Sequence, residues 1–359
     1  MKNGTKIRVA LIYGGSSGEH SVSCMTAGSV MSAIDQDKYE IVPIGIRKDG
    51  TWVEGISDLE ILGTGTAEVG PGSPITVSYG TGGILKDGER LDVDVVFPLL
   101  HGPFGEDGTI QGLFEMAGMP YVGSGVFASA AVMDKHYTKI ILREAGLPVG
   151  TWVLVTRNGW KTKRDELVEK ISKLHMPLFV KPSRAGSSLG ISRIESLDEL
   201  DAAIAEAQQH DPKVIVEQGI NGREIECAVL GGRNGDSPRA SLPGEIVLDN
   251  ADSGFYDYES KYVETDGLVL SIPANIPDSH REELRAMSIE AFEAIDCEGM
   301  ARVDFFYDDG TLVINEINTI PGFTPYSMYP LMWQRSGFTY PELIDELITL
   351  ALERNIGLR

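Results

Sequence analysis

Residues 301–322, ARVDFFYDDGTLVINEINTIPG, constrain the fold more than any other stretch of the chain. Two apolar runs flank an Asp-Asp-Gly turn, which is the pattern of a β-hairpin. Side chains alternate between the two faces of a strand, so Arg302 shares a face with Asp304. For the same reason Glu316 shares a face with Asn318. The sequence therefore predicts a hairpin that carries charged and amide groups where a plain strand would be apolar.

The length of the hairpin loop decides whether these two pairs meet. A two-residue loop at 309–310 would place Asp304 on the face opposite Glu316. A three-residue loop at 308–310 would set Arg302 opposite Glu316 and leave Asp304 diagonal to it. We choose the three-residue loop because it leaves a single apolar face, made of Val303, Phe305, Val313 and Ile317.

Two carboxylates and an amide oxygen beside a guanidinium would suit Mg²⁺ bound to phosphate, because this ion prefers oxygen ligands. The alternative is an ordinary solvated strand face with cross-strand ion pairs, since polar and apolar residues alternate in many half-exposed sheets. From the hairpin alone, both interpretations remain open.

Charge and composition exclude several classes of function. The chain has 359 residues, enough for two or three domains, and a net charge of −22 from 53 acidic and 31 basic residues. Such a surface repels nucleic acid and anionic lipid, so we expect neither as a partner. The three cysteines lack paired spacing, which argues against disulfides and zinc and fits a reducing cytoplasm. No signal peptide or apolar stretch of ~20 residues is present, so we expect a cytoplasmic protein.

The first third of the chain alternates strands and helices, which favours a parallel α/β layer. A helix is expected to run through residue 33 and another from 108 to 118. Residues 55–90 are rich in Gly and Thr and are expected to form a surface insertion with short hairpins. The strands of the layer are expected at 7–13, 40–47 and 92–100.

Beyond residue 118 the pattern is typical of an α+β arrangement. A helix is expected at 134–145, and we place strands at 152–156, 178–181 and 214–218. Capping boxes predict two further helix starts, at Ser196 with Glu199 and at Ser279 with Glu282.

The remaining stretches complete the division of the chain. Residues 238–266 are expected to form a loop, and Pro341 to start a final helix whose apolar side carries Leu343, Leu347 and Leu350. We divide the chain into three units, 1–130, 131–235 and 236–359.

A glycine- and serine-rich loop follows one of the predicted strands. The segment 178–191, LFVKPSRAGSSLGI, places Lys181 at a strand end before that loop. Small residues let backbone N–H groups approach an anion, and the lysine adds charge, so the segment favours a phosphate cradle over a plain flexible loop. It lacks the P-loop pattern, and no GxGxxG follows a strand, which weakens a dinucleotide interpretation.

Other stretches are ambiguous by themselves. The strand–turn–strand sequence at 215–230 carries three acids, Glu217, Glu224 and Glu226. They would suit a hinge that binds the ribose and base of a nucleotide, or they are solvated acids at strand ends. Glu19 heads a helix, where the dipole favours an acid, or it pairs with a substrate ammonium. His101 follows a buried strand at the edge where ligands gather, although a lone histidine is more often structural. The aromatic segment 253–263 suits a lid, or a loop pinned by its own tyrosines.

Together these segments resemble the ATP-grasp enzymes, and closely the D-alanine–D-alanine ligases. HGPFGEDGTIQG is similar to that family's N-terminal signature, and GMARVDFFYDDGTLVINEINTIPG to its C-terminal one. GGSSGEHSVS, MDK, KPSRAGSSLG and YDYESKY follow in family order. The resemblance runs from about residue 7 to the last helix. It implies an ATP-grasp fold preceded by an N-terminal Rossmann-like parallel α/β domain.

The resemblance also implies roles for motif residues. Two Mg²⁺ ions, or Mn²⁺ in their place, would be held by Asp304, Glu316 and Asn318. ATP would be bound by Lys135, Lys181, Ser188, Glu217, Ile220, Glu224 and Lys261. The catalytic residues would be Glu19, Ser187, Tyr262 and Arg302. The amino acids would be bound by Glu19, His101, Arg302, Gly322, Ser327 and Met328, the last of which is commonly Leu in the family.

The activity that the resemblance implies is ATP-dependent ligation of two D-alanine molecules, through an acyl phosphate, for peptidoglycan precursors. The alternative acceptor is D-lactate, and Tyr262 favours the dipeptide. A nucleotide-binding protein without catalysis is a third hypothesis, which the filled metal, phosphate and arginine positions disfavour. The family is usually homodimeric, and the sequence locates no interface.

Overall fold

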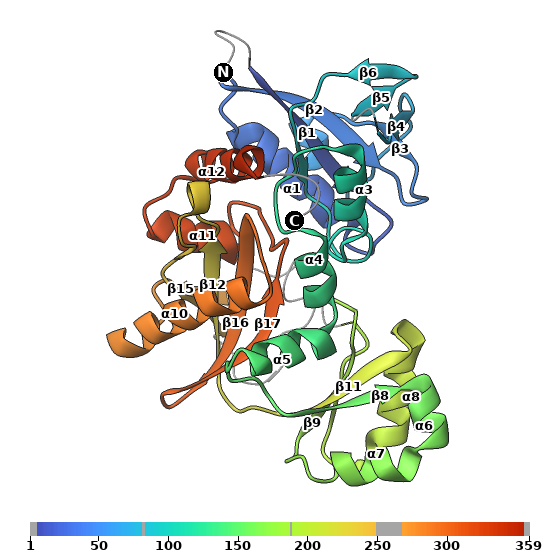
Figure 1. The fold of residues 1–359 in the computed structure, drawn as a ribbon, viewed down its shortest axis with the longest axis vertical. Coiled ribbons are helices and arrows are strands. Elements are labelled where there is room, and N and C mark those ends of the chain that lie inside the picture. Colours follow the sequence, from blue (N-terminus) through green and yellow to red (C-terminus); the bar gives the residue numbers. More distant parts are fainter. Residues whose placement is uncertain (1–5, 81–82, 187–188, 249–267, 355–359) are drawn as a thin grey trace.

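The computed structural model describes residues 6–80, 83–186, 189–248 and 268–354. Figure 1 shows the N-terminal sheet at one end of the molecule and a second sheet with its helices at the other. A third, larger sheet lies between them. Ser187, Ser188, Lys261 and Tyr262, together with the expected lid at 253–263, lie outside the described residues.

The first sheet has the strand order β3-β2-β1-β7. Strands β1 (Ile7–Gly14), β2 (Tyr39–Ile46) and β7 (Val95–Pro98) are parallel, and β3 (Trp52–Glu54) is antiparallel to β2. Helix α1 (His20–Ala33) connects β1 to β2, and helix α3 (Thr109–Ala117) follows β7, as the alternation predicted. Strand β7 is shorter than the expected 92–100.

The expected insertion of short hairpins is confirmed. Strands β4 (Ile75–Val77), β5 (Ile84–Lys86) and β6 (Glu89–Leu91) form a small antiparallel sheet beside the first one. A single short helix, α2 (Leu59–Leu62), precedes them.

The second sheet is antiparallel, with the order β10-β9-β11-β8. Its strands are β8 (Trp152–Thr156), β9 (Leu178–Pro182), β10 (Ser192–Ile194) and β11 (Lys213–Gln218). Apolar residues of these strands form one core with α7 (Arg164–Ile171) and α8 (Leu200–His210), and α6 (Arg157–Thr162) adjoins it. The capping box of Ser196 and Glu199 is confirmed, and caps the short 3-10 turn η1 (Leu197–Glu199) that leads into α8.

The third sheet contains β12 (Arg223–Leu230), which pairs with β14 (Gly244–Leu248) and with β16 (Met300–Asp308). Strand β17 (Thr311–Asn318) completes the hairpin, and β15 (Leu268–Ser271) forms the other edge. The loop expected at 238–266 is wrong in its first part, because β13 (Arg239–Ala240) and β14 extend the sheet there.

Helices α4 (Val126–Met133), α5 (Lys135–Glu144) and α10 (Asp278–Ala294) pack on one face of this sheet or lead into it. The predicted capping box of Ser279 and Glu282 is wrong. The N-cap of helix α10 is Pro277, two residues earlier, and its carbonyl accepts the first helical N–H groups. Ser279 therefore lies inside the first turn, where its side chain does not cap the helix.

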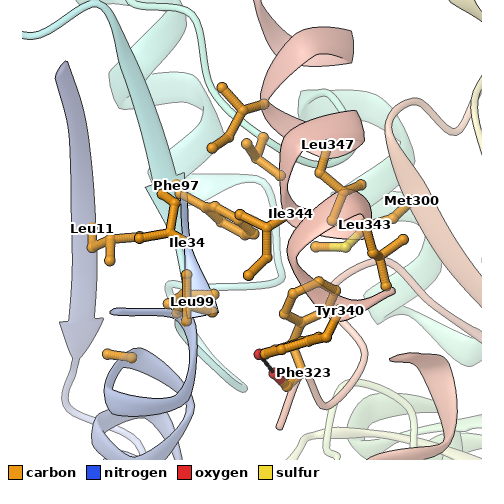
Figure 2. Packing of buried hydrophobic residues seen from close by; sticks show 14 of the residues in the cluster. Leu11, Ile34, Phe97, Leu99, Met300, Phe323, Tyr340, Leu343, Ile344 and Leu347 are labelled. Atoms are coloured by element: carbon orange, nitrogen blue, oxygen red, sulfur yellow. Dashed lines mark hydrogen bonds between the residues drawn. The ribbon is translucent and has the colours of Figure 1, made fainter. Parts of the chain in front are cut away.

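The C-terminal helix returns to the first sheet. Helix α11 (Met328–Arg335) is followed by α12 (Tyr340–Glu353), whose apolar side is buried as predicted. Figure 2 shows Ile344 of α12 facing Phe97 of the N-terminal layer. Leu343 and Leu347 belong to the same buried core as Phe97 and Leu99. The Tyr340 hydroxyl donates to the Phe323 carbonyl, so the segment after β17 is fixed against this core. Among the described residues, no helix combines the length and apolarity that crossing a bilayer requires.

Candidate active site

The β16–β17 hairpin turns through Asp309 and Gly310, whose φ angles are 41° and 92°. Asp308 pairs with Thr311, so the loop has two residues and the predicted three-residue loop is wrong. Positive φ at both central positions matches the right-handed twist of the flanking strands.

A β-bulge places the acidic residues of the hairpin on one face. The register shifts after Asp304, which pairs with Glu316, whereas Phe305 pairs with Ile314. Asn315 is the extra residue. Without it, a two-residue loop would set Asp304 opposite Asn315. The bulge instead brings Glu316 opposite Asp304, so the two carboxylates share a face, as the predicted three-residue loop was expected to achieve.

The bulge also corrects the predicted neighbours. Arg302 lies opposite Asn318, not opposite Glu316. Val313 does not belong to the apolar face with Val303; Leu312 and Ile314 are buried there in its place.

The Arg302 guanidinium has a ring of polar partners. Its Nε and Nη2 each donate to Asp304 at 2.7 Å, and Asn318 Nδ2 donates to the same carboxylate at 2.9 Å. Glu226 Oε2 lies 3.3 Å from Arg302 Nε. Burial opposes the charge, but Asp304 and Glu226 hold the pKa of Arg302 well above its usual value. The guanidinium therefore stays positive while largely shielded from water.

Glu226 was only one of three candidate acids in the sequence. The structure places it on β12 directly opposite Asp304, with 8 % of its surface exposed. Its alternation with the buried Ile225 and Cys227 gave no signal of this role, because the partner strand was not known.

The hairpin donors suit Mg²⁺ by their chemistry. Asp304, Glu316 and Asn318 bring two carboxylates and an amide to paired positions, and Mg²⁺ is commonly held by one or two carboxylates together with substrate phosphates. Within the described ranges, no cluster of three or more Asp, Glu, His or Cys side chains is gathered for a metal. Phosphate oxygens would therefore have to complete the site, and Asp304 would exchange its contact with Arg302 for the ion.

Three lysines create a local positive charge in this acidic protein. Lys135 is the first residue of α5, and its Nζ donates to the Ala185 carbonyl at 2.6 Å. Lys181 of β9 and Lys139 of α5 reach the same carboxylate, that of Glu217, at 2.7 and 2.6 Å. Positive charge concentrated in this way suits a triphosphate.

The pKa shifts show how tightly this cluster is coupled. Burial would raise the pKa of Glu217, but Lys139 and Lys181 outweigh it and lower that pKa to about 2. Burial lowers the pKa of Lys135 below its ordinary value. Lys139 was missed in the sequence because nothing local shows that a residue of α5 reaches β11.

A cavity of about 370 Å³ lies between the end of β11 and the outer face of the hairpin. Ile220, Phe306 and Val313 give it apolar walls that suit a flat aromatic base. Glu217 is buried one residue before its edge, and Glu224 lies opposite Phe306 in the β12–β16 ladder. The cavity is lined by Val149, Gly150, Thr151, Gln218, Gly219, Ile220, Asn221, Phe306, Asp308, Thr311 and Val313.

Glu19 and His101, which are far apart in sequence, lie next to each other at the edge of the first sheet. A Cβ on Gly102 would come within 3.3 Å of Glu19 Oε2, so the carboxylate lies against this backbone. Glu19 is the N-cap residue of α1, yet its side chain accepts no capping hydrogen bond.

His101 is buried, with Nδ1 3.8 Å from Glu106 Oε1. Burial opposes protonation, but Glu106 and Glu19 together raise the pKa of His101. Burial also raises the pKa of Glu106. This group of an imidazole and two carboxylates beside glycine backbone can recognise a small zwitterion.

The segment after the hairpin brings Gly322 and Ser327 together. A Cβ on Gly322 would lie 3.1 Å from Ser327 Oγ, which also accepts the Thr324 N–H. Ser327 is the N-cap residue of α11 without capping it by its side chain. Met328 is buried, and its Cε lies beside Gly244. Its side chain therefore packs in the core, and its backbone forms the first residue of α11.

Two family models match the chain, one over its N-terminal third and one over most of the remainder. Residues 8–124 match the family model described as D-ala D-ala ligase N-terminus, and residues 141–349 match D-ala D-ala ligase C-terminus. A D-alanine--D-alanine ligase of Pseudarthrobacter chlorophenolicus is 53% identical, over 99% of this chain and 96% of that protein.

Solved structures agree in fold. The VanG D-Ala:D-Ser ligase from Enterococcus faecalis has a TM-score of 0.85 at 38% identity, covering 97% of this chain and 100% of that one. The D-alanine-D-alanine ligase from Coxiella burnetii has a TM-score of 0.81 at 36% identity, with coverages of 97% and 94%. The expected ATP-grasp fold, preceded by a parallel α/β layer, is confirmed. The chain belongs to the D-alanine–D-alanine ligase family.

Proposed function

We propose that this chain is an enzyme that joins two molecules of D-alanine, using ATP and releasing ADP and phosphate, for peptidoglycan precursors. The observation that carries the proposal is the polar face of the hairpin, which sets Arg302, Asp304 and Glu316 together. The full-length similarity to proteins named D-alanine--D-alanine ligase supports it.

ATP would bind between the second sheet and the hairpin. The base would enter the cavity beside Ile220, Phe306 and Val313, and Glu224 would meet the ribose. The triphosphate would draw on Lys135 and Lys181, with Lys261 and Ser188 assigned by resemblance alone. Lys181 would then leave Glu217, and Lys139 would remain as the partner that keeps this buried carboxylate ionised.

The first chemical step makes a poor electrophile reactive. A carboxylate oxygen of the first D-alanine attacks the γ-phosphorus of ATP, the bond to the β-phosphate oxygen breaks, and an acyl phosphate and ADP result. Arg302 would stabilise the negative charge on the moving phosphoryl group, since a guanidinium matches phosphate oxygens in geometry. Bound Mg²⁺, held by Asp304, Glu316 and Asn318, would supply further neutralisation of the phosphates.

The second step forms the peptide bond. The amine of the second D-alanine attacks the activated carbonyl, and phosphate leaves. Glu19 would hold the ammonium group of the first D-alanine, with His101 beside it. Acyl phosphates hydrolyse, so water must be excluded. The resemblance assigns this closure to Ser187 and Tyr262.

The carboxylate of the second amino acid would bind at the start of α11. Backbone N–H groups of a helix N-terminus attract anions, and Gly322 and Ser327 border this one. The side chain of Met328 points into the core, so a change from leucine would leave this backbone contact in place.

D-serine is a second candidate acceptor, because a relative of known structure is named a D-Ala:D-Ser ligase. The more similar curated relatives carry the D-alanine name, which favours the dipeptide of D-alanine and disfavours D-lactate. We also propose the three units 1–130, 131–235 and 236–359, a homodimer, and a cytoplasmic location.

An acceptor screen tests the proposal. The purified chain is mixed with Mg-ATP and D-alanine alone, or with D-serine or D-lactate added, and phosphate and products are measured. We expect one phosphate per D-alanyl-D-alanine and little mixed product at neutral pH. Preference for D-lactate or D-serine, or no D-alanine-dependent phosphate release, would overturn it.

A further inference from the structure

A buried carboxylate outside the groups discussed above joins the two segments that carry Lys135 and Lys181. Asp134 is only 6 % exposed. Its Oδ1 accepts the Ser183 hydroxyl at 2.8 Å, and its two oxygens accept Lys213 Nζ at 2.8 and 2.7 Å. The contacts come from three parts of the chain: the start of α5, the turn after β9, and the start of β11.

Helix capping alone does not explain this arrangement. Asp134 is the N-cap residue of α5 and accepts the His136 N–H at 3.2 Å. A cap needs one oxygen and can remain at the surface. Here the same carboxylate is buried and also bonded to Ser183 and Lys213, so it connects elements that a cap would leave independent.

Ser183 is the joint between these elements. Its N–H donates to the Lys213 carbonyl at 2.9 Å, and its own carbonyl accepts the Lys135 N–H at 2.9 Å. Its hydroxyl donates to Asp134. The polar groups of this fully buried residue therefore fix both α5 and the start of β11 to the end of β9.

The two lysines lie on either side of this joint. Lys135 directly follows Asp134, and its Nζ reaches the Ala185 carbonyl in the turn after Ser183. Lys181 precedes Ser183 by two residues on β9. A shift of α5 against β9 would therefore change the distance between the two ammonium groups. Lys213, whose Nζ also lies 3.9 Å from the Tyr137 ring centre, opposes such a shift.

We propose that Asp134 is a positioning residue that sets the spacing of Lys135 and Lys181 for the triphosphate of ATP, acting through Ser183 and Lys213. This rests on the proposed binding of ATP by the two lysines. It assigns no contact with substrate to Asp134 itself. Its loss should weaken recognition of phosphate and leave recognition of the nucleoside unchanged.

The test compares ATP with adenosine in an Asp134→Asn variant of the full chain. The affinity for ATP is measured by calorimetry, and that for adenosine as its inhibition constant against ATP. We expect ATP affinity to fall about tenfold or more, because charge-assisted hydrogen bonds that hold the two lysines in place are lost. The inhibition constant of adenosine and the KM for D-alanine should each change by less than about twofold, well below the tenfold loss expected for ATP.

Two further variants make the result specific. Lys213→Met should have a similar effect, and the double variant should lose little more than either single one, because both act through one contact. Asp201→Asn is the matched control: it removes a carboxylate that also accepts two hydrogen bonds from one cation, Arg164, but at the surface. It should leave ATP affinity unchanged.

Should Asp134→Asn fail to fold, Ser183→Ala removes one hydrogen bond of the same joint and should weaken ATP in the same selective way. A folded Asp134 variant with normal ATP affinity would overturn the inference. So would equal losses for ATP and adenosine, which indicate general damage to the site. Absence of ATP binding by the unaltered chain would overturn the proposed function, and this inference with it.

Discussion

Replacing Glu217 by glutamine should destabilise the protein in a strongly pH-dependent way. Glu217 is buried between Lys139 and Lys181, which lower its pKa from 4.5 to about 2. A folded-state pKa below the unfolded value means that the stabilisation is complete above pH 4.5 and is lost as pH falls toward 2. A pKa lowered to about 2 corresponds to a stabilisation on the order of 3 kcal/mol at neutral pH.

The same pKa values predict how the contribution of Glu217 to stability changes with pH. At pH 3.5 the folded state still holds Glu217 mostly ionised, and its contribution falls to about 2 kcal/mol. Below pH 2 the acid and the amide should behave alike. The difference in free energy of unfolding between the wild type and Glu217→Gln should therefore shrink as the solution is acidified.

Urea unfolding, followed by tryptophan fluorescence at pH 7 and pH 3.5, measures this difference. A gap of a few kcal/mol at pH 7 that narrows at pH 3.5 is the expected result. Asp201→Asn, in an exposed ion pair, serves as control and should change stability by less than about 1 kcal/mol. A variant as stable as the wild type at pH 7, or a gap that does not narrow, would show that the two lysines do not hold Glu217 in this way.

Three further predictions concern the reaction. Arg302→Lys should lower kcat about 10²-fold or more in steady-state assays, because an ammonium cannot reproduce the bidentate fork; near-normal turnover would contradict the role of Arg302. Glu226→Gln should lower kcat about tenfold with little change in the KM for ATP, because it removes one charged contact of the guanidinium; a rise in that KM alone would place Glu226 elsewhere. Burial lowers the pKa of Lys135, so this lysine should lose its charge at a lower pH than an ordinary lysine does. As pH is raised, kcat/KM for ATP should therefore fall earlier than an ordinary lysine would give. Lys135→Arg should move this fall to higher pH, and an unmoved profile would assign it to another group.

The alternation of side chains was enough to predict the polar hairpin, but not its register. Two loop lengths were compatible with Asp-Asp-Gly, and the chosen one was wrong. The shared face of Asp304 and Glu316 depends on the bulge at Asn315. A bulge is decided by packing on both sides of the strand, as when Ile314 and Ile317 both enter the core, and no local residue announces it.

The sequence alone also could not identify residues whose role depends on the pairing of distant segments. Glu226 gained significance only when β12 paired with β16, and Lys139 only when α5 was placed against β11. The amphipathic pattern predicted the last helix, but not that it would pack on the first sheet. By contrast Lys135, Lys181, Glu217 and Ile220 were predicted from the motif resemblance. The structure pairs Lys181 with Glu217 and places Ile220 in the wall of the cavity.

Oxygen transfer from D-alanine to phosphate is the measurement that bears on the proposed chemistry. D-alanine labelled with ¹⁸O in its carboxylate is incubated with the enzyme, Mg²⁺ and unlabelled ATP, and the released phosphate is analysed by mass spectrometry. Phosphoryl transfer to the carboxylate predicts one labelled oxygen in the phosphate for each dipeptide formed. Unlabelled phosphate, or label recovered in AMP, would contradict an acyl phosphate formed beside Arg302.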